Sequence, residues 1–295
     1  MVAADKTFNG APYAKRKGFL RPGFASWTVG GVIIGVVTLF ALFPSAFATH
    51  PPEAANARAI LLPPSFQNLL GTDINGSDIW SRIVWAARID LVIAVVSTFF
   101  GTIGGTLLGT WAGYHFSRLG PRGRLAELSM RVMDMLQAFP IFVIALAAVG
   151  VSGRSVYNLI WVLVALQIPI FARLARAEVV RIRSEAYVDA ARCSGNGDLG
   201  VMFRHILPNA LTPTIANASV VAGQMILLTA GLSFIGAGVP APTPEWGYMV
   251  SIGAESLFTG QWWPALFPGL VIGLTVLGFS LLGEGVRSAL DRTTG

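Results

Sequence analysis

The sequence predicts an all-α, polytopic membrane protein, and three observations support this fold class. Hydrophobic residues make up 54% of the 295-residue chain and charged residues only 12%, whereas soluble domains carry about 25% charged residues. Six apolar runs have about the length that a bilayer-spanning helix needs. Lysine and arginine gather at the ends of these runs, so the net charge of +6 reflects membrane topology and does not indicate a nucleic-acid partner.

The chain begins with a polar, basic segment, residues 1–28, which we expect to be a cytoplasmic tail. The first apolar run, residues 29–48, is long enough to span a membrane. A cleaved signal peptide is the alternative, because Ala46-Phe47-Ala48 resembles a cleavage site. The run exceeds the usual apolar core of a signal peptide and its lead-in is long, so we favour an uncleaved helix.

Five further spans follow a mixed, proline-rich segment that we expect outside the membrane. This segment ends at residue 88 and forms, with the first helix, the region 29–88. The remaining spans are predicted at residues 91–114, 130–151, 156–171, 213–236 and 264–282. Together with a cytoplasmic loop at 185–208, they form a transmembrane domain over residues 89–292.

The distribution of basic residues predicts that both termini are cytoplasmic. With the N-terminus inside, seventeen of the 21 lysines and arginines fall on cytoplasmic segments. Only four fall on external segments: Arg58, Arg82, Arg88 and Arg154. The same positive-inside asymmetry places the 185–208 loop in the cytoplasm.

Glycine recurs at every fourth position of the second span, at Gly101, Gly105, Gly109 and Gly113. This row, termed the glycine ridge, would let two helices approach closely, so we expect a packing surface and not a pore lining. The sequence leaves open whether the helix packed on the ridge belongs to the same chain or to a second subunit.

Polar side chains are few within the predicted spans. Asn217 and Gln224 lie seven residues apart, on one face of the fifth span. They either join helices by hydrogen bonds or line a substrate pathway. Near the start of the third span, Arg131 and Asp134 have the spacing of a structural ion pair.

The cytoplasmic loop at residues 185–208, termed the knob, has the pattern of two short helices joined by a turn. In the first helix, Tyr187, Ala190 and Ala191 share one face by their spacing. The turn falls at residues 194–197, where glycine and asparagine tolerate positive φ. The knob either packs on its own membrane domain or enters a groove on another protein, for which its alanines leave room.

The second helix of the knob should run from Asp198 to about Pro208. We expect Asp198 to be its N-cap, and Arg204 and His205 to lie in its last turn, where cations meet the negative end of the helix dipole. Pro208 cannot continue the helical hydrogen bonds, so we expect the helix to end there. The single cysteine, Cys193, excludes an internal disulfide and is expected to be an inert residue of the turn.

The knob resembles the EAA loop of ABC-importer inner-membrane permeases. Three features carry the resemblance: Asp189-Ala190-Ala191, Gly195 six residues after Asp189, and Leu207-Pro208 in register. Asp189 stands where the family has glutamate, and His205 stands where it has isoleucine. Residues 206–209 are similar to the dipeptide, oligopeptide and nickel branch, and the likeness covers about residues 25–292.

The resemblance implies the type I ABC importer permease fold, with six transmembrane helices in a bacterial inner membrane. It implies that the knob docks into a cytoplasmic ATPase and transmits its movement. The residues expected to couple the two proteins are Tyr187, Asp189, Ala190, Ala191, Arg192, Gly195, Leu207 and Pro208. It further implies a heterodimer with a homologous second permease, P-loop ATPase subunits that bind ATP and magnesium, and an external solute-binding protein.

Two external segments add to the resemblance. Residues 70–82 are similar to the family's signature before the second span, although Ser77 replaces an arginine and Asp90 stands where serine is common. Residues 242–247 resemble a motif of the peptide branch between the last two spans. Prolines stiffen this loop, and Trp246 suits a membrane interface. External carboxylates are expected to cap loops and helices by hydrogen bonds, namely Asp73, Asp78 and Glu245.

Motifs of enzymes are absent from the sequence. It has no P-loop signature for binding ATP, no nucleophile motif, and no cluster of histidine, cysteine and carboxylate with metal-ligand spacing. We therefore expect a transporter subunit that itself binds no metal or cofactor and takes its energy from the partner ATPase.

The leading hypothesis is a permease subunit that moves peptides or peptide-like solutes by alternating access. An importer permease for nickel or another small solute is the alternative, because selectivity resides largely in the binding protein. An ion-coupled secondary transporter ranks lower, because the predicted spans hold no carboxylate in their central parts. A membrane anchor or sensor would not need the knob.

Overall fold

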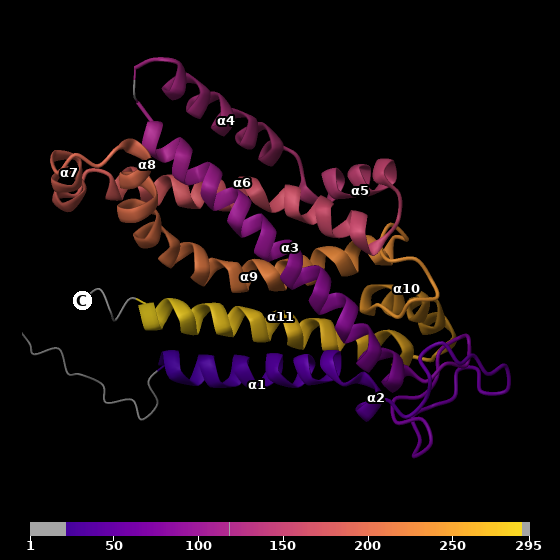
Figure 1. Cartoon of the computed structure of the whole chain (residues 1–295). Helices are drawn as coiled ribbons and strands as arrows, with labels where there is room; N and C mark the ends of the chain where they lie inside the picture. The colour runs from indigo at the N-terminus through magenta and orange to yellow at the C-terminus, as the bar shows by residue number, and fades with distance from the viewer. Residues whose placement is uncertain (1–21, 118, 291–295) are drawn as a thin grey trace, which may run out of the picture.

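The computed structural model describes residues 22–117 and 119–290, and every regular element in these ranges is helical (Figure 1). The long helices are α1 (Pro22–Leu42), α3 (Ile79–His115), α4 (Pro121–Ala138), α6 (Val156–Ile182), α9 (Leu207–Phe234) and α11 (Trp263–Leu290). The shorter elements are α2 (Pro44–Phe47), α5 (Ile141–Ser152), α7 (Ala186–Cys193), α8 (Asp198–Gly200), a π-helical turn (Val201–Ile206), α10 (Trp246–Ser256) and a 3₁₀ turn (Leu257–Thr259). The all-α prediction is confirmed for these residues.

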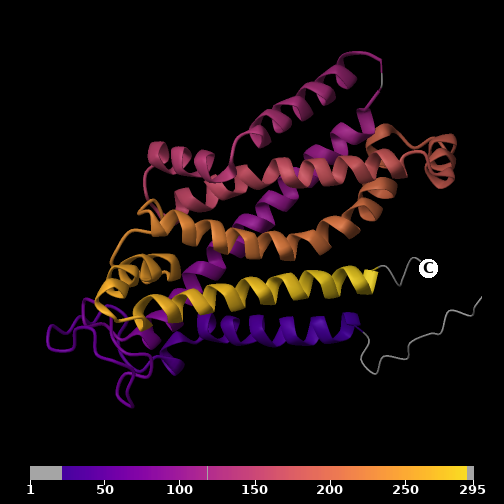
Figure 2. The same ribbon diagram turned by 180° about the vertical axis from the view of Figure 1, so that it is seen from behind.

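The long helices form one bundle, which α3 crosses obliquely. In both views α6, α9, α11 and α1 follow one another in this order, with α4 and α5 outside α6 (Figure 1, Figure 2). The most extensive packing of α3 is on α6, and α3 also contacts α9 and α1. The knob lies at the same end of the bundle as the start of α1 and the end of α11 (Figure 1). The α10 helix and the segment between α2 and α3 lie at the opposite end (Figure 1).

The glycine ridge of α3 packs against α6 of the same chain. A Cβ atom added at Gly105 would lie 2.6 Å from the Phe171 Cβ and 2.7 Å from the Ile168 carbonyl oxygen. A Cβ atom added at Gly109 would lie 2.2 Å from the Ala172 carbonyl oxygen. Non-bonded atoms do not approach so closely, so glycine is required for the two backbones to touch. The ridge is therefore an intrachain packing surface, which decides between the two alternatives that the sequence left open.

Four helices of the described residues are long and apolar enough to cross a membrane: α3, α6, the continuous helix Asp198–Phe234, and α11. The predicted third span, 130–151, is not one helix, because α4 and α5 meet at 95°; taken as one broken span, they make a fifth. Pro140 explains the break, since Phe139 before it is extended, at φ −91° and ψ 147°. The apolar part of α1, Ser26–Leu42, is shorter than these spans and supplies the sixth apolar segment.

Several helix boundaries differ from the predicted spans. Residues 1–21 of the predicted tail lie outside the described residues, and residues 22–28 already belong to α1. The first helix ends at Leu42 because Phe43, which precedes a proline, leaves the helical region at φ −125° and ψ 53°. Both α3 and α6 extend beyond their apolar runs, α3 at its start and α6 at its end.

Pro208 does not end the second helix of the knob, contrary to the prediction. The α8 helix, the π-helical turn and α9 run as one helix from Asp198 to Phe234, with Pro208 in the first turn of α9. A proline lacks an N–H and its ring presses on the carbonyl four residues earlier. The wider turn at Val201–Ile206 lies directly before the proline and accommodates both defects. The second half of the knob is therefore continuous with the fifth span.

Candidate functional site

The knob projects from one end of the bundle as two helical pieces joined by a tight turn (Figure 1). After α7 ends, Gly195 takes a positive φ of 84°. Its N–H donates to the Arg192 carbonyl at 3.0 Å. The side-chain amide of Asn196 donates to the Ala191 carbonyl, also at 3.0 Å. The predicted turn is confirmed, and glycine suits it because a side chain would strain the backbone at this φ.

The two faces of α7 differ in exposure. Val188 and Ala191 are buried, at 0% and 7% exposure, and Val188 packs in a core that includes Val201 of the second helical piece. Tyr187 and Ala190 are exposed. The α7 helix keeps the spacing that places Tyr187, Ala190 and Ala191 near one another, but Ala191 is buried and the other two are exposed. Ala191 also follows Val188 by three residues, and the packing of the knob on the bundle buries this side of the helix.

Asp189 is exposed, and its charge is paired within α7. Its Oδ1 accepts a hydrogen bond from Arg192 Nη1 at 2.8 Å, and the two side chains are 64% and 37% exposed. The Arg192 guanidinium also lies 5.9 Å from the centre of the Tyr114 ring. An exposed ion pair contributes only about 0–1 kcal/mol, so a cation on another protein could replace Arg192 with little loss.

The second helical piece exposes apolar side chains that the sequence patterns did not indicate. Leu199 and Phe203 are 69% and 47% exposed, and they lie four residues apart on one face. Further along the same helix, Leu207 is half-buried and Pro208 is exposed. The spacing of Leu199 and Phe203 was visible in the sequence, but their orientation depends on how the helix packs against the bundle. The exposed surface of the knob thus combines apolar side chains with the Asp189 carboxylate.

The base of the knob is bonded to the end of α3. The N-cap of α8 is Gly197, and Asp198 is the first helical residue, so the predicted capping role of Asp198 is wrong. Its carboxylate instead accepts a 2.6 Å hydrogen bond from the hydroxyl of Tyr114, which is 1% exposed. Arg204 and His205 lie in the last turn of the π-helical segment, but this is not a helix end, because the helix continues to Phe234. The prediction that they meet the negative end of a helix dipole is therefore wrong.

At the opposite end of the bundle, Asp73 and Asp78 organise the segment before α3. Asp73 accepts hydrogen bonds from two backbone N–H groups of the following turn, at 2.8 and 2.9 Å, and from Arg82 Nη1 at 3.1 Å. Asp78 is the N-cap of α3 and accepts from the Ser81 N–H at 2.9 Å. Both carboxylates are buried. The predicted capping roles are confirmed at these two residues.

Glu245 and Trp246 are fully buried beside Asp90 of α3. Glu245 is the N-cap of α10 and accepts from two backbone N–H groups at 2.9 and 2.7 Å, which confirms its predicted capping role. The Trp246 backbone N–H donates to Asp90 Oδ2 at 3.1 Å, and its indole N–H donates to the Ile83 carbonyl at 3.0 Å. The expected position of Trp246 at a membrane interface is wrong, because both of its donors find partners inside the protein.

Burial raises the pKa of the Glu245 carboxyl, although the hydrogen bonds that it accepts from two backbone N–H groups offset part of the rise. Asp90 itself is 1% exposed and lies inside α3, although the predicted span began just after it. Asp90 precedes the predicted span 91–114, so the central part of that span still holds no carboxylate, as expected.

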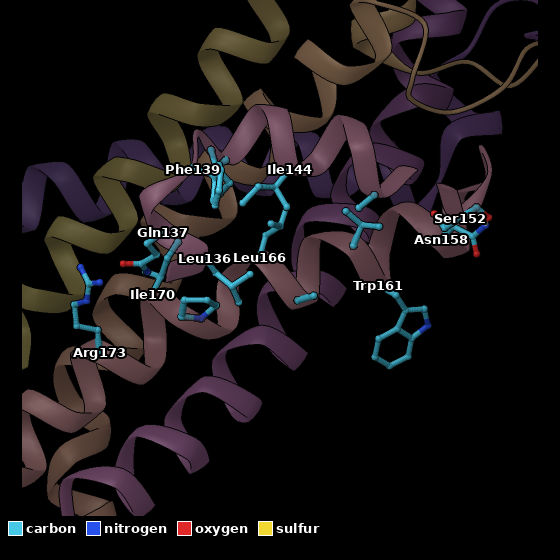
Figure 3. A pocket seen from close by; sticks show the side chains of 15 residues that line it. Leu136, Gln137, Phe139, Ile144, Ser152, Asn158, Trp161, Leu166, Ile170 and Arg173 are labelled. Carbon is cyan, nitrogen blue, oxygen red and sulfur yellow. Dashed lines mark hydrogen bonds between the residues drawn. The ribbon is translucent and has the colours of Figure 1, made fainter. Parts of the chain in front are cut away.

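A cavity of about 770 Å³ lies between the broken α4–α5 pair and α6 (Figure 3). Its wall is mostly apolar, and its polar side chains gather toward the two ends. Gln137 and Arg173 lie toward one end, and Ser152 and Asn158 lie toward the other (Figure 3). This volume is typical of small-molecule sites, which enclose about 300–1,000 Å³.

The candidate pathway residues of the sequence, Asn217 and Gln224, lie on α9 and do not line this cavity. Asn217 is half-buried and Gln224 is exposed. Their side chains are thus on the outside of this chain or near it, where a lipid, a second subunit or a solute could meet them.

The ion pair predicted between Arg131 and Asp134 does not form. Arg131 pairs with Glu127 at 2.7 Å, one helical turn earlier. Asp134 pairs with Arg173 of α6 at 2.6 Å, so it links two helices beside the cavity. Packing of α4 on α6 explains the difference, because it brings a second arginine to the aspartate.

Comparison with known proteins adds to this geometry. Residues 105–295 match the family described as "Binding-protein-dependent transport system inner membrane component". The chain is 38% identical to the dipeptide transport system permease protein of Alkalihalophilus pseudofirmus, over 89% of this chain and 84% of that one. It is 36% identical to a probable D,D-dipeptide transport system permease protein of Escherichia coli, over 98% and 93%. It is 37% identical to a di/tripeptide transport system permease protein of Pseudomonas aeruginosa, over 89% and 87%.

Proposed function

The chain belongs to the family of binding-protein-dependent transport system inner membrane components, and we propose that it is one permease subunit of an ATP-driven peptide importer. The structure of the knob is the observation that most directly supports the proposal. The knob is an exposed element, closed by Gly195 at positive φ and continuous with a helix long enough to span the membrane. An element of this kind in a multi-pass membrane protein can receive movement from a soluble protein and pass it to the spans.

Residues 185–208 would dock on a cytoplasmic ATPase that binds ATP and magnesium. ATP binding would draw two ATPase subunits together and move the knob with them. The bundle would then open its pathway outward, where an external binding protein delivers the solute, and hydrolysis would reset it. A homologous second permease would complete the pathway as a heterodimer, and the knob and both termini would face the cytoplasm.

Peptides are the proposed solute class, because the three relatives described above are named for the transport of di- or tripeptides. Asn217 and Gln224 remain candidate pathway residues, since their partly exposed side chains could meet a solute between two subunits. The cavity beside α6 is a second candidate, because its apolar wall suits peptide side chains and its polar ends suit charged termini.

Two substitutions on the exposed face of α7 test the proposal. Asp189→Arg reverses a charge, and Ala190→Trp adds bulk at a position that is exposed, unlike Ala191. Charge-assisted contacts are worth about 1.5–3 kcal/mol, so we expect at least a roughly tenfold loss of ATPase affinity. The matched control is Ala55→Trp, in an exposed loop at the opposite end of the bundle.

The measurements are copurification of the ATPase with tagged permease and ATP-dependent peptide uptake in proteoliposomes with the binding protein. Asp189→Arg and Ala190→Trp should lower both, whereas Ala55→Trp should keep the ATPase bound. If both α7 variants retained the ATPase and uptake at wild-type levels, the knob would not be the docking element.

A further inference from the structure

The junction between the knob and α3 contains a hydrogen bond whose role does not follow from the similarity to known permeases. Tyr114, in the last turn of α3, donates its hydroxyl hydrogen to Asp198 Oδ1 at 2.6 Å. The two residues are 84 positions apart in the sequence. A hydrogen bond from a buried hydroxyl to a carboxylate is short and directional. It therefore fixes the first residue of α8 onto the end of α3.

Arg183 makes a second connection at the same place. It is the C-cap of α6, and its Nη1 donates to the carbonyls of Gly113 at 3.3 Å and Phe116 at 2.5 Å. The last carbonyls of a helix lack part of their intrahelical hydrogen bonding and carry the negative end of the dipole. The guanidinium groups of Arg183 and Arg176 also lie 5.6 and 4.6 Å from the centre of the Phe116 ring. Cationic groups of α6 thus hold the end of α3.

An apolar core fills the space between these polar contacts. Tyr114 belongs to a buried cluster that joins α3, α6, the knob and the start of α9, and its other members are Val179, Ile182, Val188, Val201, Met202, Ile206 and Ala210. The glycine ridge reaches this core at its last member, since a Cβ atom added at Gly113 would lie 2.9 Å from the Val179 Cβ. The ends of α3 and α6 and both pieces of the knob therefore share one core, in which the Tyr114–Asp198 bond joins α3 to α8.

We propose that Tyr114 is a positioning residue for coupling: its hydrogen bond to Asp198 ties the knob to α3, so that movement of the knob carries α3 and, through the glycine ridge, α6. This inference rests on the proposed function as an importer permease. It is distinct from docking, because Tyr114 is buried and Asp189 and Ala190 form the exposed face. Without the bond, the ATPase should still bind and turn over, but less of its movement should reach the spans.

Two conservative substitutions test this role. Tyr114→Phe keeps the ring within the apolar core and removes only the hydroxyl. Asp198→Asn keeps an acceptor oxygen and removes the charge. The matched control is Tyr157→Phe, at a tyrosine of α6 that is 68% exposed. Each variant is assembled with the second permease, the ATPases and the binding protein, and is studied in proteoliposomes with a dipeptide as solute.

Three quantities are measured: the ATPase that copurifies, the rate of ATP hydrolysis, and the dipeptide taken up per ATP hydrolysed. For Tyr114→Phe we expect unchanged copurification, retained hydrolysis and at least a roughly fivefold lower uptake per ATP, because coupling between sites typically amounts to about 5- to 150-fold. Asp198→Asn should lower the same ratio. The double variant should be no worse than Tyr114→Phe alone, since both changes act on the same hydrogen bond.

An uptake-to-ATP ratio that stays at the wild-type value in Tyr114→Phe and Asp198→Asn would overturn the inference. Loss of the assembled transporter in both variants would also overturn it, because the bond would then serve stability alone. Failure of the proposed function looks different: the wild-type assembly would show no ATP-dependent uptake, and the inference would fall with it.

Discussion

A methyl group added to α3 at Gly109 tests how closely α3 packs on α6. In Gly109→Ala, the new Cβ would lie 2.2 Å from the Ala172 carbonyl oxygen and 2.9 Å from its Cα. Close carbon–oxygen contacts in proteins are about 3.3–3.6 Å, so the helices would have to separate locally by roughly 1 Å. Overpacking of this kind destabilises a protein by about 1–3 kcal/mol.

The matched control is Gly104→Ala, the same change in the same helix. There, the added Cβ would meet only the Ile168 side chain, at an ordinary 3.5 Å. Alanine is favoured over glycine in a helix by about 1 kcal/mol at either position. The difference between the two variants therefore isolates the overpacking, and we expect Gly109→Ala to be less stable than Gly104→Ala by about 1–3 kcal/mol.

The assay is the thermal unfolding of each purified variant in the same detergent, together with its abundance in the membrane. Gly109→Ala should unfold at a lower temperature than both wild type and Gly104→Ala. If Gly109→Ala unfolded at the same temperature as Gly104→Ala or above it, the close contact between α3 and α6 would be refuted.

Two further predictions concern the two ends of the bundle. Gly195→Val should weaken ATPase copurification without lowering abundance, because a side chain at φ 84° costs about 1–2 kcal/mol in the turn; Gly236→Val, at φ 82° on the other end, should keep the ATPase bound. Equal copurification of the two variants would contradict this expectation. The pKa of Glu245 is raised in the folded protein. Above the ordinary pKa of glutamate, about 4.3, the unfolded chain has therefore lost a proton that the folded protein still holds. The free energy of unfolding should therefore fall as pH rises from there to the folded pKa, and the unfolding temperature should fall with it. Glu245→Gln should show a smaller fall over the same pH range. If the unfolding temperatures of wild type and Glu245→Gln changed equally with pH, this expectation would be contradicted.

Much of the fold could be predicted from composition and charge. The apolar runs mark the long helices, and the glycine spacing marks the packing face of α3. Helix ends were predicted less well, because a helix can continue beyond its apolar run. The α6 helix runs on through an arginine-rich segment to Ile182, and α3 begins at Ile79 because Asp78 caps it there.

The sequence predicts those parts of the candidate site whose backbone conformation only one residue type readily adopts. Gly195 is such a case, because only glycine readily adopts the positive φ of the turn. The burial of Ala191 and the exposure of Leu199 depend on the packing of the knob against α3 and α6, which periodicity does not fix. The hydrogen bonds from Tyr114 to Asp198 and from Trp246 to Asp90 join residues 84 and 156 positions apart, and no local pattern contains such pairs.

The helix from Asp198 to Phe234 runs without a break from the knob into the membrane-spanning part of the bundle. Its 37 residues have a length of about 55 Å along the helix at 1.5 Å per residue, whereas the hydrocarbon core of a bilayer is about 30 Å thick. One end carries the exposed Leu199 and Phe203, and the other leads toward the loop that holds Glu245. The α3 helix packs on this helix and is bonded to its first residue, so the two should move together. A push on the knob should then reach the far end through the helix backbone, without a relay of side chains across the membrane.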